Sequence, residues 1–176
     1  MDNFAEQIVK KQLSGSEKLK RAVIIVAGVI MILLLVGFSF LMLGQGFTSF
    51  VGLLLAAGTG YGTFFIVQNM EVEYEYTFTN GELDIDKIIA KKKRKELVSV
   101  SVGKFTAFGK YDDSVPEETD DMTVVLASNN IASEEYYADL THDAYGSTRI
   151  IFCPEGKMLE QIKKSLPRAL KAKMDE

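Results

Sequence analysis

The feature that most constrains this chain is the run Ala22–Met70, which contains no Lys, Arg, Asp, Glu or His. The hydrocarbon core of a bilayer is about 30 Å thick and one spanning helix needs about 20 apolar residues, so the run is long enough for two helices. It divides near its middle at Gly44-Gln45-Gly46, the one place suited to a turn. The sequence therefore predicts a membrane α-helical hairpin within residues 22–70, with transmembrane helices at 22–43 and 47–67.

The first hydrophobic segment has the properties of a permanent span. A signal-peptide core has about 7–15 apolar residues and ends in small residues at a cleavage site, whereas 22–43 is longer and ends in Phe38–Leu43 without such a site. Five Lys and Arg residues precede it and none lies in the turn, so the positive-inside rule places both termini in the cytoplasm. We therefore expect a two-span protein of the cell membrane.

The segment before the spans, residues 1–21, is predicted to be a cytoplasmic N-terminal tail. Its apolar points are Phe4, Ile8 and Leu13, and this spacing fits a short amphipathic helix resting on the membrane surface. A solvated tail that only supplies positive charge fits the same residues. The sequence alone leaves both interpretations open.

Small residues in the second span indicate close helix packing. Gly58 and Gly62 form a G-x-x-x-G pair, which lets two helix backbones approach each other in lipid. The pair serves either packing within the hairpin or a homodimer face, and the first interpretation is simpler because two helices already need a mutual interface. Neither span contains an ionisable residue, which argues against transport by the hairpin alone and favours an anchor.

The region 71–176 has the pattern of a soluble α+β domain. Residues 71–79 and 82–88 alternate polar and apolar positions, as strands do, and Asn80-Gly81 between them is typical of a tight hairpin turn. Apolar positions at helical spacing from Met158 to Leu170 predict a C-terminal helix that Pro167 kinks or ends. Further strand candidates are 97–102, 104–109, 123–127, 135–140 and 147–152.

About seven short strands followed by one amphipathic helix is the element order of a pleckstrin-homology-like (PH-like) barrel. Residues 76–85, Tyr-Thr-Phe-Thr-Asn-Gly-Glu-Leu-Asp-Ile, then a basic stretch and Leu97-Val98-Ser99-Val100, resemble the opening of bacterial PH-like domains that follow two spans. The whole chain resembles an uncharacterised family of small two-span bacterial membrane proteins. This resemblance implies an antiparallel PH-like barrel in a cytoplasmic domain at 71–176 and a role in membrane-associated binding or regulation. It carries no catalytic residues.

The first hairpin loop departs from the lipid-binding PH domains of eukaryotes. Those domains have a basic pocket around this loop, whereas here Asn80-Gly81 is flanked by Glu82 and Asp84. The resemblance therefore does not imply phosphoinositide binding by that route.

No pattern in the sequence predicts a catalytic, cofactor-binding or metal-binding residue. His142, the only histidine, is interpreted as a turn residue, and Cys153, the only cysteine, as a small buried hydrophobe. The acidic loop 112–121 lacks the turn glycine of a calcium-binding loop and is interpreted as a solvated, mobile loop. The domain carries 15 basic and 21 acidic side chains, a balance that argues against nucleic acid as a partner.

The main candidate for an interaction surface is the run Lys91, Lys92, Lys93, Arg94 and Lys95. These cations cannot be buried, so they form a loop or a strand edge that contacts lipid headgroups, contacts an acidic patch on a partner, or is merely solvated. The predicted function is a membrane-anchored, non-enzymatic binding or regulatory module. The alternatives are an accessory subunit of a membrane enzyme or transporter whose chemistry lies on a partner chain, and a structural homo-oligomer. The bilayer is the expected partner, a second protein or a second copy is left open, and no small-molecule ligand is assigned.

Overall fold

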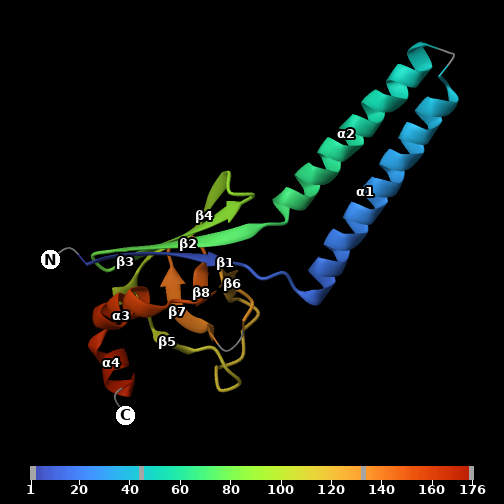
Figure 1. Ribbon diagram of the computed structural model, residues 1–176. Coiled ribbons are helices and arrows are strands. Elements are labelled where there is room, and N and C mark those ends of the chain that lie inside the picture. The colour runs from blue at the N-terminus through green and yellow to red at the C-terminus, as the bar shows by residue number, and fades with distance from the viewer. Residues whose placement is uncertain (1–2, 44–45, 132–133, 175–176) are drawn as a thin grey trace. The chain divides into compact units, whose positions relative to one another are not determined.

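The computed structural model describes residues 3–43, 46–131 and 134–174 and forms two compact units. One unit, Leu13–Glu71, contains the helices α1 (Gly15–Leu41) and α2 (Phe47–Asn69). The other unit, called the domain below, combines the chain before Leu13 with the chain from Val72 onward (Figure 1). The predicted turn residues Gly44 and Gln45 lie outside the described residues.

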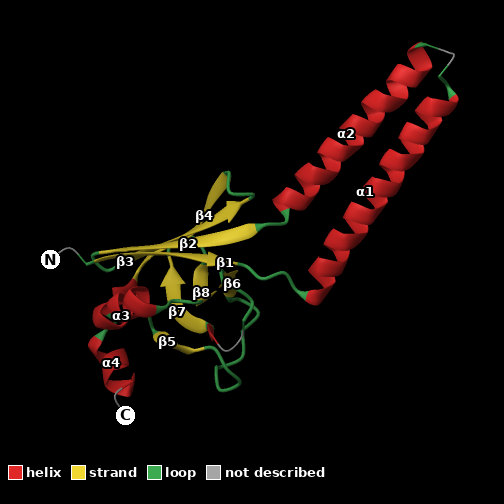
Figure 2. Ribbon diagram, viewed as in Figure 1, coloured by secondary structure: helices red, strands yellow, loops and turns green. Residues whose placement is uncertain are grey.

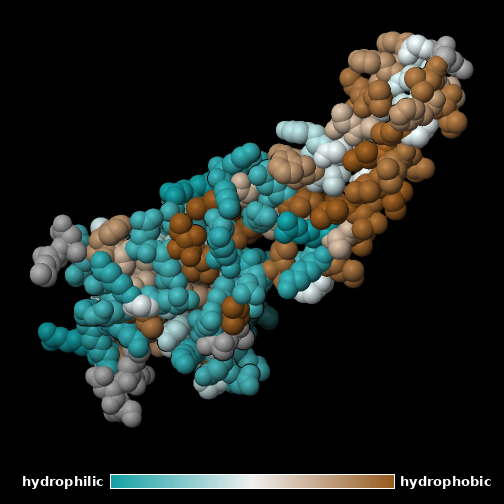
Figure 3. Space-filling model, in the orientation of Figure 1, coloured by the Kyte–Doolittle hydropathy of each residue, from teal (hydrophilic) through white to brown (hydrophobic). Residues whose placement is uncertain are grey.

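The hairpin helices α1 and α2 are long and apolar enough to cross a membrane. They run side by side in opposite directions, because Gly28 lies against Thr63 and Gly52 against Ser39 (Figure 1). Their large apolar side chains point away from each other, so the hydrophobic colour of Figure 3 covers the outside of the hairpin. Both helices are therefore consistent with the predicted membrane spans.

The first helix begins earlier than the predicted span. Ser14 and Glu17 form a capping box, in which the Glu17 backbone N–H donates to Ser14 Oγ at 3.3 Å and the Ser14 N–H donates to Glu17 Oε2 at 2.8 Å. These bonds satisfy backbone donors that a helix start leaves open. A polar helical segment at 15–21 therefore precedes the apolar part of α1.

The predicted N-terminal tail is wrong, because Phe4–Lys10 forms strand β1 of the domain. The strand pairs antiparallel with β2 (Val72–Thr79), from Phe4 opposite Thr79 to Lys10 opposite Glu73. Its inward positions are Ala5 and Val9, which are buried, whereas Phe4 and Ile8 are about half exposed. The helical spacing of Phe4 and Ile8 was misleading because these side chains lie on the outer face of an edge strand.

The first sheet has the order β1-β2-β3-β4, in which β3 is Glu82–Ile89 and β4 is Lys93–Ser101. The predicted hairpin at Asn80-Gly81 is confirmed, since both residues have positive φ angles of 51° and 98° and connect β2 to β3. A two-residue turn with positive φ at both positions matches the twist of the strands that it joins.

The second sheet has the order β5-β7-β8-β6 (Figure 2). The predicted antiparallel barrel differs from this arrangement in two respects. First, β6 pairs with β8 in parallel. The strands β5 and β6 lie at opposite edges of this sheet, so the chain that connects β5 to β6 crosses from one edge to the other. Second, among the described residues no ladder joins the two sheets, so they form no closed barrel. The strands are β5 (Ala107–Lys110), β6 (Thr123–Leu126), β7 (Tyr136–His142) and β8 (Gly146–Phe152).

The core of the domain lies between the sheets and the C-terminal helix α3 (Gly156–Ser165), which buries Met158 and Ile162. Tyr76 and Phe152 pack edge to face at its centre, with ring centroids 5.8 Å apart. The expected helix end near Ser165 is confirmed, because α3 stops there and the short helix α4 (Arg168–Met174) follows Pro167. The short 3-10 helix η1 (Val102–Lys104) connects the two sheets.

The helical hairpin of α1 and α2 is inserted between two paired strands of the domain. Lys10 of β1 lies opposite Glu73 of β2, and the Lys11 backbone N–H donates to the Val72 carbonyl at 3.0 Å. The chain therefore leaves the domain for α1, and returns from α2, at one end of the first sheet. The domain is continuous in space but discontinuous in sequence.

Candidate interaction surface

The predicted basic run forms the turn between β3 and β4 and the start of β4. Ala90 and Lys91 adopt positive φ angles of 53° and 56°, and the Lys92 backbone N–H donates to the Ile89 carbonyl at 3.1 Å. Lys93, Arg94 and Lys95 begin β4, an edge strand of the first sheet. All five side chains are exposed. We call residues 91–95 the basic turn.

Ion pairs offset most of the negative charge of the carboxylates on β2 and β3 beside the basic turn. Arg94 pairs with Glu75, which is almost fully buried, and also lies 3.6 Å from Asp86. Lys10 lies 3.8 Å from Glu73 on the neighbouring strand. Within the part of the chain that the structure describes, no carboxylate lies within ion-pairing distance of the other four cations of the turn. Four positive charges therefore remain available at this surface: Lys91, Lys92, Lys93 and Lys95.

The basic turn lies at the end of the sheet where the hairpin is inserted. Val72 of β2 is opposite Ile89 of β3, which is opposite Lys93 of β4. Neighbouring strands are about 4.8 Å apart, so Lys93 lies about 10 Å from Val72. The turn is thus close, in the domain itself, to both connections of the chain to α1 and α2.

Hydrogen bonds fix both connections to the domain. The Gln12 backbone N–H donates to the Asn129 carbonyl at 2.9 Å, and Asn130 Nδ2 donates to the Gln12 carbonyl at 2.8 Å. On the other side, Val72 is held through its carbonyl by Lys11. Between these fixed residues and the helices α1 and α2, the connections are Leu13-Ser14 on one side and Met70-Glu71 on the other.

The glycine pair of the second span does not pack within the hairpin. A Cβ atom built on Gly58 or Gly62 would meet nothing within 4 Å, whereas one on Gly28 would lie 2.5 Å from Thr63 Oγ1 and one on Gly52 would overlap Ser39 Oγ. The interpretation of Gly58 and Gly62 as hairpin contacts is therefore wrong, and the homodimer face stays a prediction. Which glycines face the partner helix depends on the rotation of each helix, which the sequence pattern did not reveal.

His142 and Cys153 occupy structural positions. The Ala144 backbone N–H donates to His142 Nδ1 at 3.1 Å, and the histidine ring stacks on Tyr145 with centroids 4.6 Å apart. The Cys153 thiol is fully buried and donates to Asn129 Oδ1 at 3.2 Å. Burial raises the pKa of this thiol to about 11, which keeps it in the unreactive protonated form at neutral pH.

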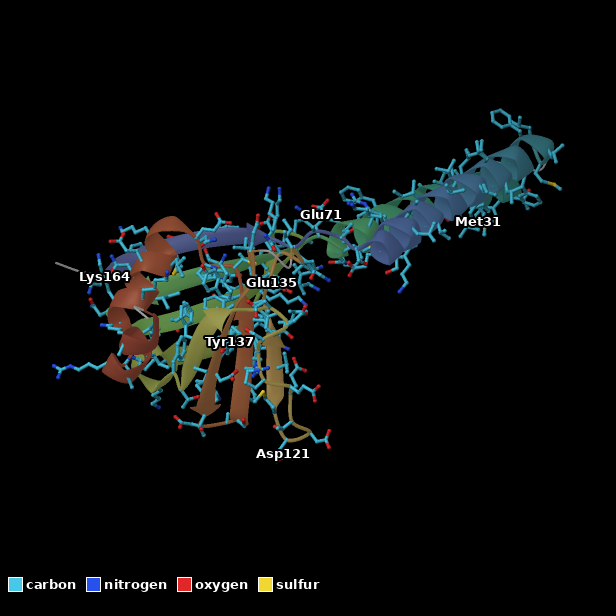
Figure 4. All side chains as sticks on the ribbon, turned by 90° about the horizontal axis from the view of Figure 1, so that it is seen from below. Met31, Glu71, Asp121, Glu135, Tyr137 and Lys164 are labelled. Carbon is cyan, nitrogen blue, oxygen red and sulfur yellow. The ribbon has the colours of Figure 1, made fainter. Side chains whose placement is uncertain are left out.

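The acidic loop 112–121 contacts a buried ion pair of the second sheet that sequence reasoning missed. Arg149 of β8 is 1% exposed, and its Nε and Nη2 donate to the two carboxylate oxygens of Asp139 at 2.7 and 2.8 Å. Arg149 Nη1 donates to the Pro116 carbonyl at 2.7 Å, and the guanidinium lies over the ring of Tyr137. Figure 4 labels Tyr137 on the second sheet. These contacts hold the loop on the sheet at Pro116. No local signal marked this pair, because its partners come from three separate segments.

A cavity of about 760 Å³ lies beside this ion pair and is lined mainly by carboxylates. Hydrogen bonds from the hydroxyl and backbone N–H of Ser114 lower the pKa of the Asp112 carboxyl. Among the described residues, no group of three or more His, Cys, Asp or Glu side chains is arranged to hold a metal ion. The acidic residues that line the cavity are Asp112, Asp113, Glu117, Glu118 and Glu135.

These features define a PH-like α+β domain with two long apolar helices inserted between its first two strands. The chain belongs to the bacterial PH-like domain family DUF6106, which it matches over residues 1–172. The match includes β1, both helices and the second part of the domain as far as residue 172, so the inserted hairpin is covered by the family pattern. No curated protein and no solved structure matches the chain.

Proposed function

We propose that this protein is a membrane-anchored, non-enzymatic binding or regulatory module that uses the basic turn as its contact surface. In this proposal the hairpin is a two-span anchor in the cell membrane and the PH-like domain is cytoplasmic. The observation that carries the proposal is the position of the four unpaired lysines, next to the point where both chain connections leave the domain.

The pairing of β1 with β2 supports the proposed topology. β1 precedes α1 and β2 follows α2, so both flanks of the hairpin belong to one folded domain. If both helices cross the bilayer, the two flanks are on the same side. The Lys and Arg residues that precede the first span make the cytoplasm that side.

A photo-cross-linking experiment in native membranes tests the proposed contact. A photoreactive amino acid replaces Glu96, next to the basic turn, or Glu82, an exposed glutamate at the opposite end of β3. We expect cross-links from position 96 that disappear when Lys91, Lys92, Lys93 and Lys95 are changed to Gln. The matched control changes four exposed cations of the C-terminal helices to Gln: Lys157, Lys163, Lys164 and Arg168.

Two outcomes would contradict this proposal. The first is the same cross-links in both quadruple variants. The second is a stoichiometric enzyme or transporter that copurifies whether or not the lysines are present, which would support an accessory subunit. Lysines on an edge strand also prevent pairing between the sheet edges of two molecules, so the Lys→Gln variant can aggregate. Sedimentation of each variant shows whether missing cross-links come from a lost contact or from aggregation.

A second candidate function, a structural homo-oligomer, is favoured by the glycine pair of α2 that does not pack against α1. Gly58 and Gly62 contact nothing in the hairpin, and their spacing suits a second helix in lipid. In this case Gly58→Leu and Gly62→Leu would abolish oligomers in detergent, while the quadruple Lys→Gln variant would retain them. Equal oligomer content in all of these variants would exclude this function.

A further inference from the structure

We propose that the four unpaired lysines of the basic turn bind the anionic headgroups of the same bilayer that holds the hairpin. This inference rests on the proposed function and assigns the contact surface to lipid rather than to an acidic patch on a protein. It is argued from the length of the connections, the local charge and the separation of charge within the domain.

The short connections keep the basic turn close to the bilayer surface. The apolar part of α2 extends to Val67, and only four residues separate it from Val72. Even if Met70 and Glu71 are fully extended, at about 3.6 Å per residue, Val72 lies within roughly 15 Å of Val67, where the apolar part of α2 and hence the hydrocarbon ends. The headgroup layer is about 5–8 Å thick on each side and Lys93 is about 10 Å from Val72, so the connections allow the lysine side chains to reach this layer when the basic turn faces the membrane.

The local charge makes this contact attractive. Glu73, Glu75 and Asp86 would repel an anionic surface, but Lys10 pairs with Glu73 and Arg94 is shared between the other two, so the four lysines leave an excess of positive charge here. Anionic lipids attract a lysine near the surface, and the attraction falls off within a Debye length of about 8–10 Å. The connections are short enough to bring the four unpaired lysines within this length of the headgroups when the basic turn faces the membrane.

The distribution of charge within the domain favours one orientation of the domain toward an anionic surface. The basic turn belongs to the first sheet, whereas the acidic loop contacts the second sheet, where Arg149 holds it. An anionic surface therefore attracts one layer of the domain and repels the other. Because each connection is only two residues long, this difference selects the orientation in which the basic turn faces the headgroups.

The experiment compares the unmodified full-length chain in two kinds of vesicle, pure phosphatidylcholine and phosphatidylcholine with about one-third phosphatidylglycerol. Acetylation rates of individual lysines are measured by mass spectrometry with acetic anhydride as the reagent. We expect Lys91, Lys92, Lys93 and Lys95 to react roughly fivefold more slowly in the anionic vesicles, because bound ammonium groups are shielded. Three exposed lysines of α3, Lys157, Lys163 and Lys164, serve as the control within the same chain.

Salt provides a second criterion. At about 1 M salt the Debye length is about 3 Å, so the difference between the two vesicles should disappear. Equal rates for the basic turn in both vesicles, or a difference that persists at high salt or extends equally to α3, would overturn the lipid assignment. If that assignment failed while the cross-links from position 96 still depended on the lysines, the proposed function would stand with a protein as partner.

Discussion

The hairpin and the domain are packed in opposite ways. The interior of the domain contains its largest apolar side chains, including Tyr76, Phe78 and Phe152, none of which is exposed. The interface between α1 and α2 instead contains Gly28, Ser39, Gly52 and Ala56, and the large side chains of the hairpin lie outside. Large apolar residues are thus buried in one unit and exposed in the other.

The difference follows from the solvent that each unit requires. In water, burial of a large apolar side chain stabilises a fold by about 1.5–3 kcal/mol, so the domain places these residues inside. In lipid there is no such gain, and helices associate through close backbone contact and hydrogen bonds. Ser49 Oγ, for example, donates to the Ser39 carbonyl across the hairpin at 2.9 Å. The packing of the hairpin is itself an argument for its place in a bilayer.

The largest expected effect concerns whether the domain folds without the hairpin. Residues 3–12 joined to 72–176 by a short Gly-Ser linker should fold, because the Lys11 N–H and the Val72 carbonyl are only 3.0 Å apart. Residues 72–176 alone should lose cooperative unfolding, since removal of β1 costs on the order of the total stability, about 5 kcal/mol or more. Thermal unfolding followed by circular dichroism compares the two. Equal melting curves would show that β1 is dispensable.

The next effect concerns the buried ion pair between Arg149 and Asp139. Asp139→Ala leaves the guanidinium of the almost fully buried Arg149 without its carboxylate partner, and the expected loss of stability is about 3–5 kcal/mol. Asp143→Ala is the control, because that carboxylate is exposed and pairs only with Lys104 at 3.6 Å. Urea unfolding of the linked domain measures both. A similar loss in the two variants would mean that burial does not distinguish the pairs.

A smaller effect separates two kinds of glycine in the hairpin. Gly28→Ala places a methyl group against Thr63 and should destabilise helix packing by about 1–3 kcal/mol. Gly58→Ala meets nothing within 4 Å and should be neutral or slightly stabilising, because alanine favours the helix. Unfolding of the full chain in mixed micelles of increasing SDS content measures the difference. The reverse order of stability would contradict the placement of Gly28 of α1 against α2 and of Gly58 of α2 away from α1.

The smallest effect concerns the basic turn. Lys91 has a φ of 56°, a left-handed conformation that costs a side-chain-bearing residue roughly 1–2 kcal/mol relative to glycine. Lys91→Gly should therefore raise the stability of the linked domain by up to about 1 kcal/mol, since glycine also gains freedom in the unfolded chain. Lys92→Gly provides the comparison, because Lys92 lies in the same turn without positive φ. A greater gain at Lys92 would contradict this account.

Local patterns predicted much of the fold. The two helices, the hairpin at Asn80-Gly81, the seven strands from Val72 onward and the helix end near Pro167 all follow from features within a few residues of each other. Hydrophobic periodicity and turn chemistry act at this range, which is why they were sufficient here. The position of the basic run in a turn and an edge strand was predicted for the same reason.

Features set by distant partners were not predicted. The inward positions of β1 are Ala5, Gln7 and Val9, and Gln7 is polar because its amide bonds the Cys153 carbonyl and the Glu155 N–H in the domain. The alternation of apolar residues that identifies a strand is therefore missing from β1. The parallel pairing of β6 and the Arg149–Asp139 pair likewise depend on contacts between segments that are far apart in the sequence.

The insertion of the hairpin between β1 and β2 imposes an order on biosynthesis. β1 leaves the ribosome first, but its partner β2 follows only after the whole segment Leu13–Glu71, a delay of several seconds at about 5–20 residues per second. If the two helices are the spans of the proposed topology, they enter the bilayer during this interval while β1 has an unpaired edge. In that topology a chain that inserts only one helix leaves β1 and β2 in different compartments, and its domain cannot be completed. Folding of the domain would then depend on insertion of both helices.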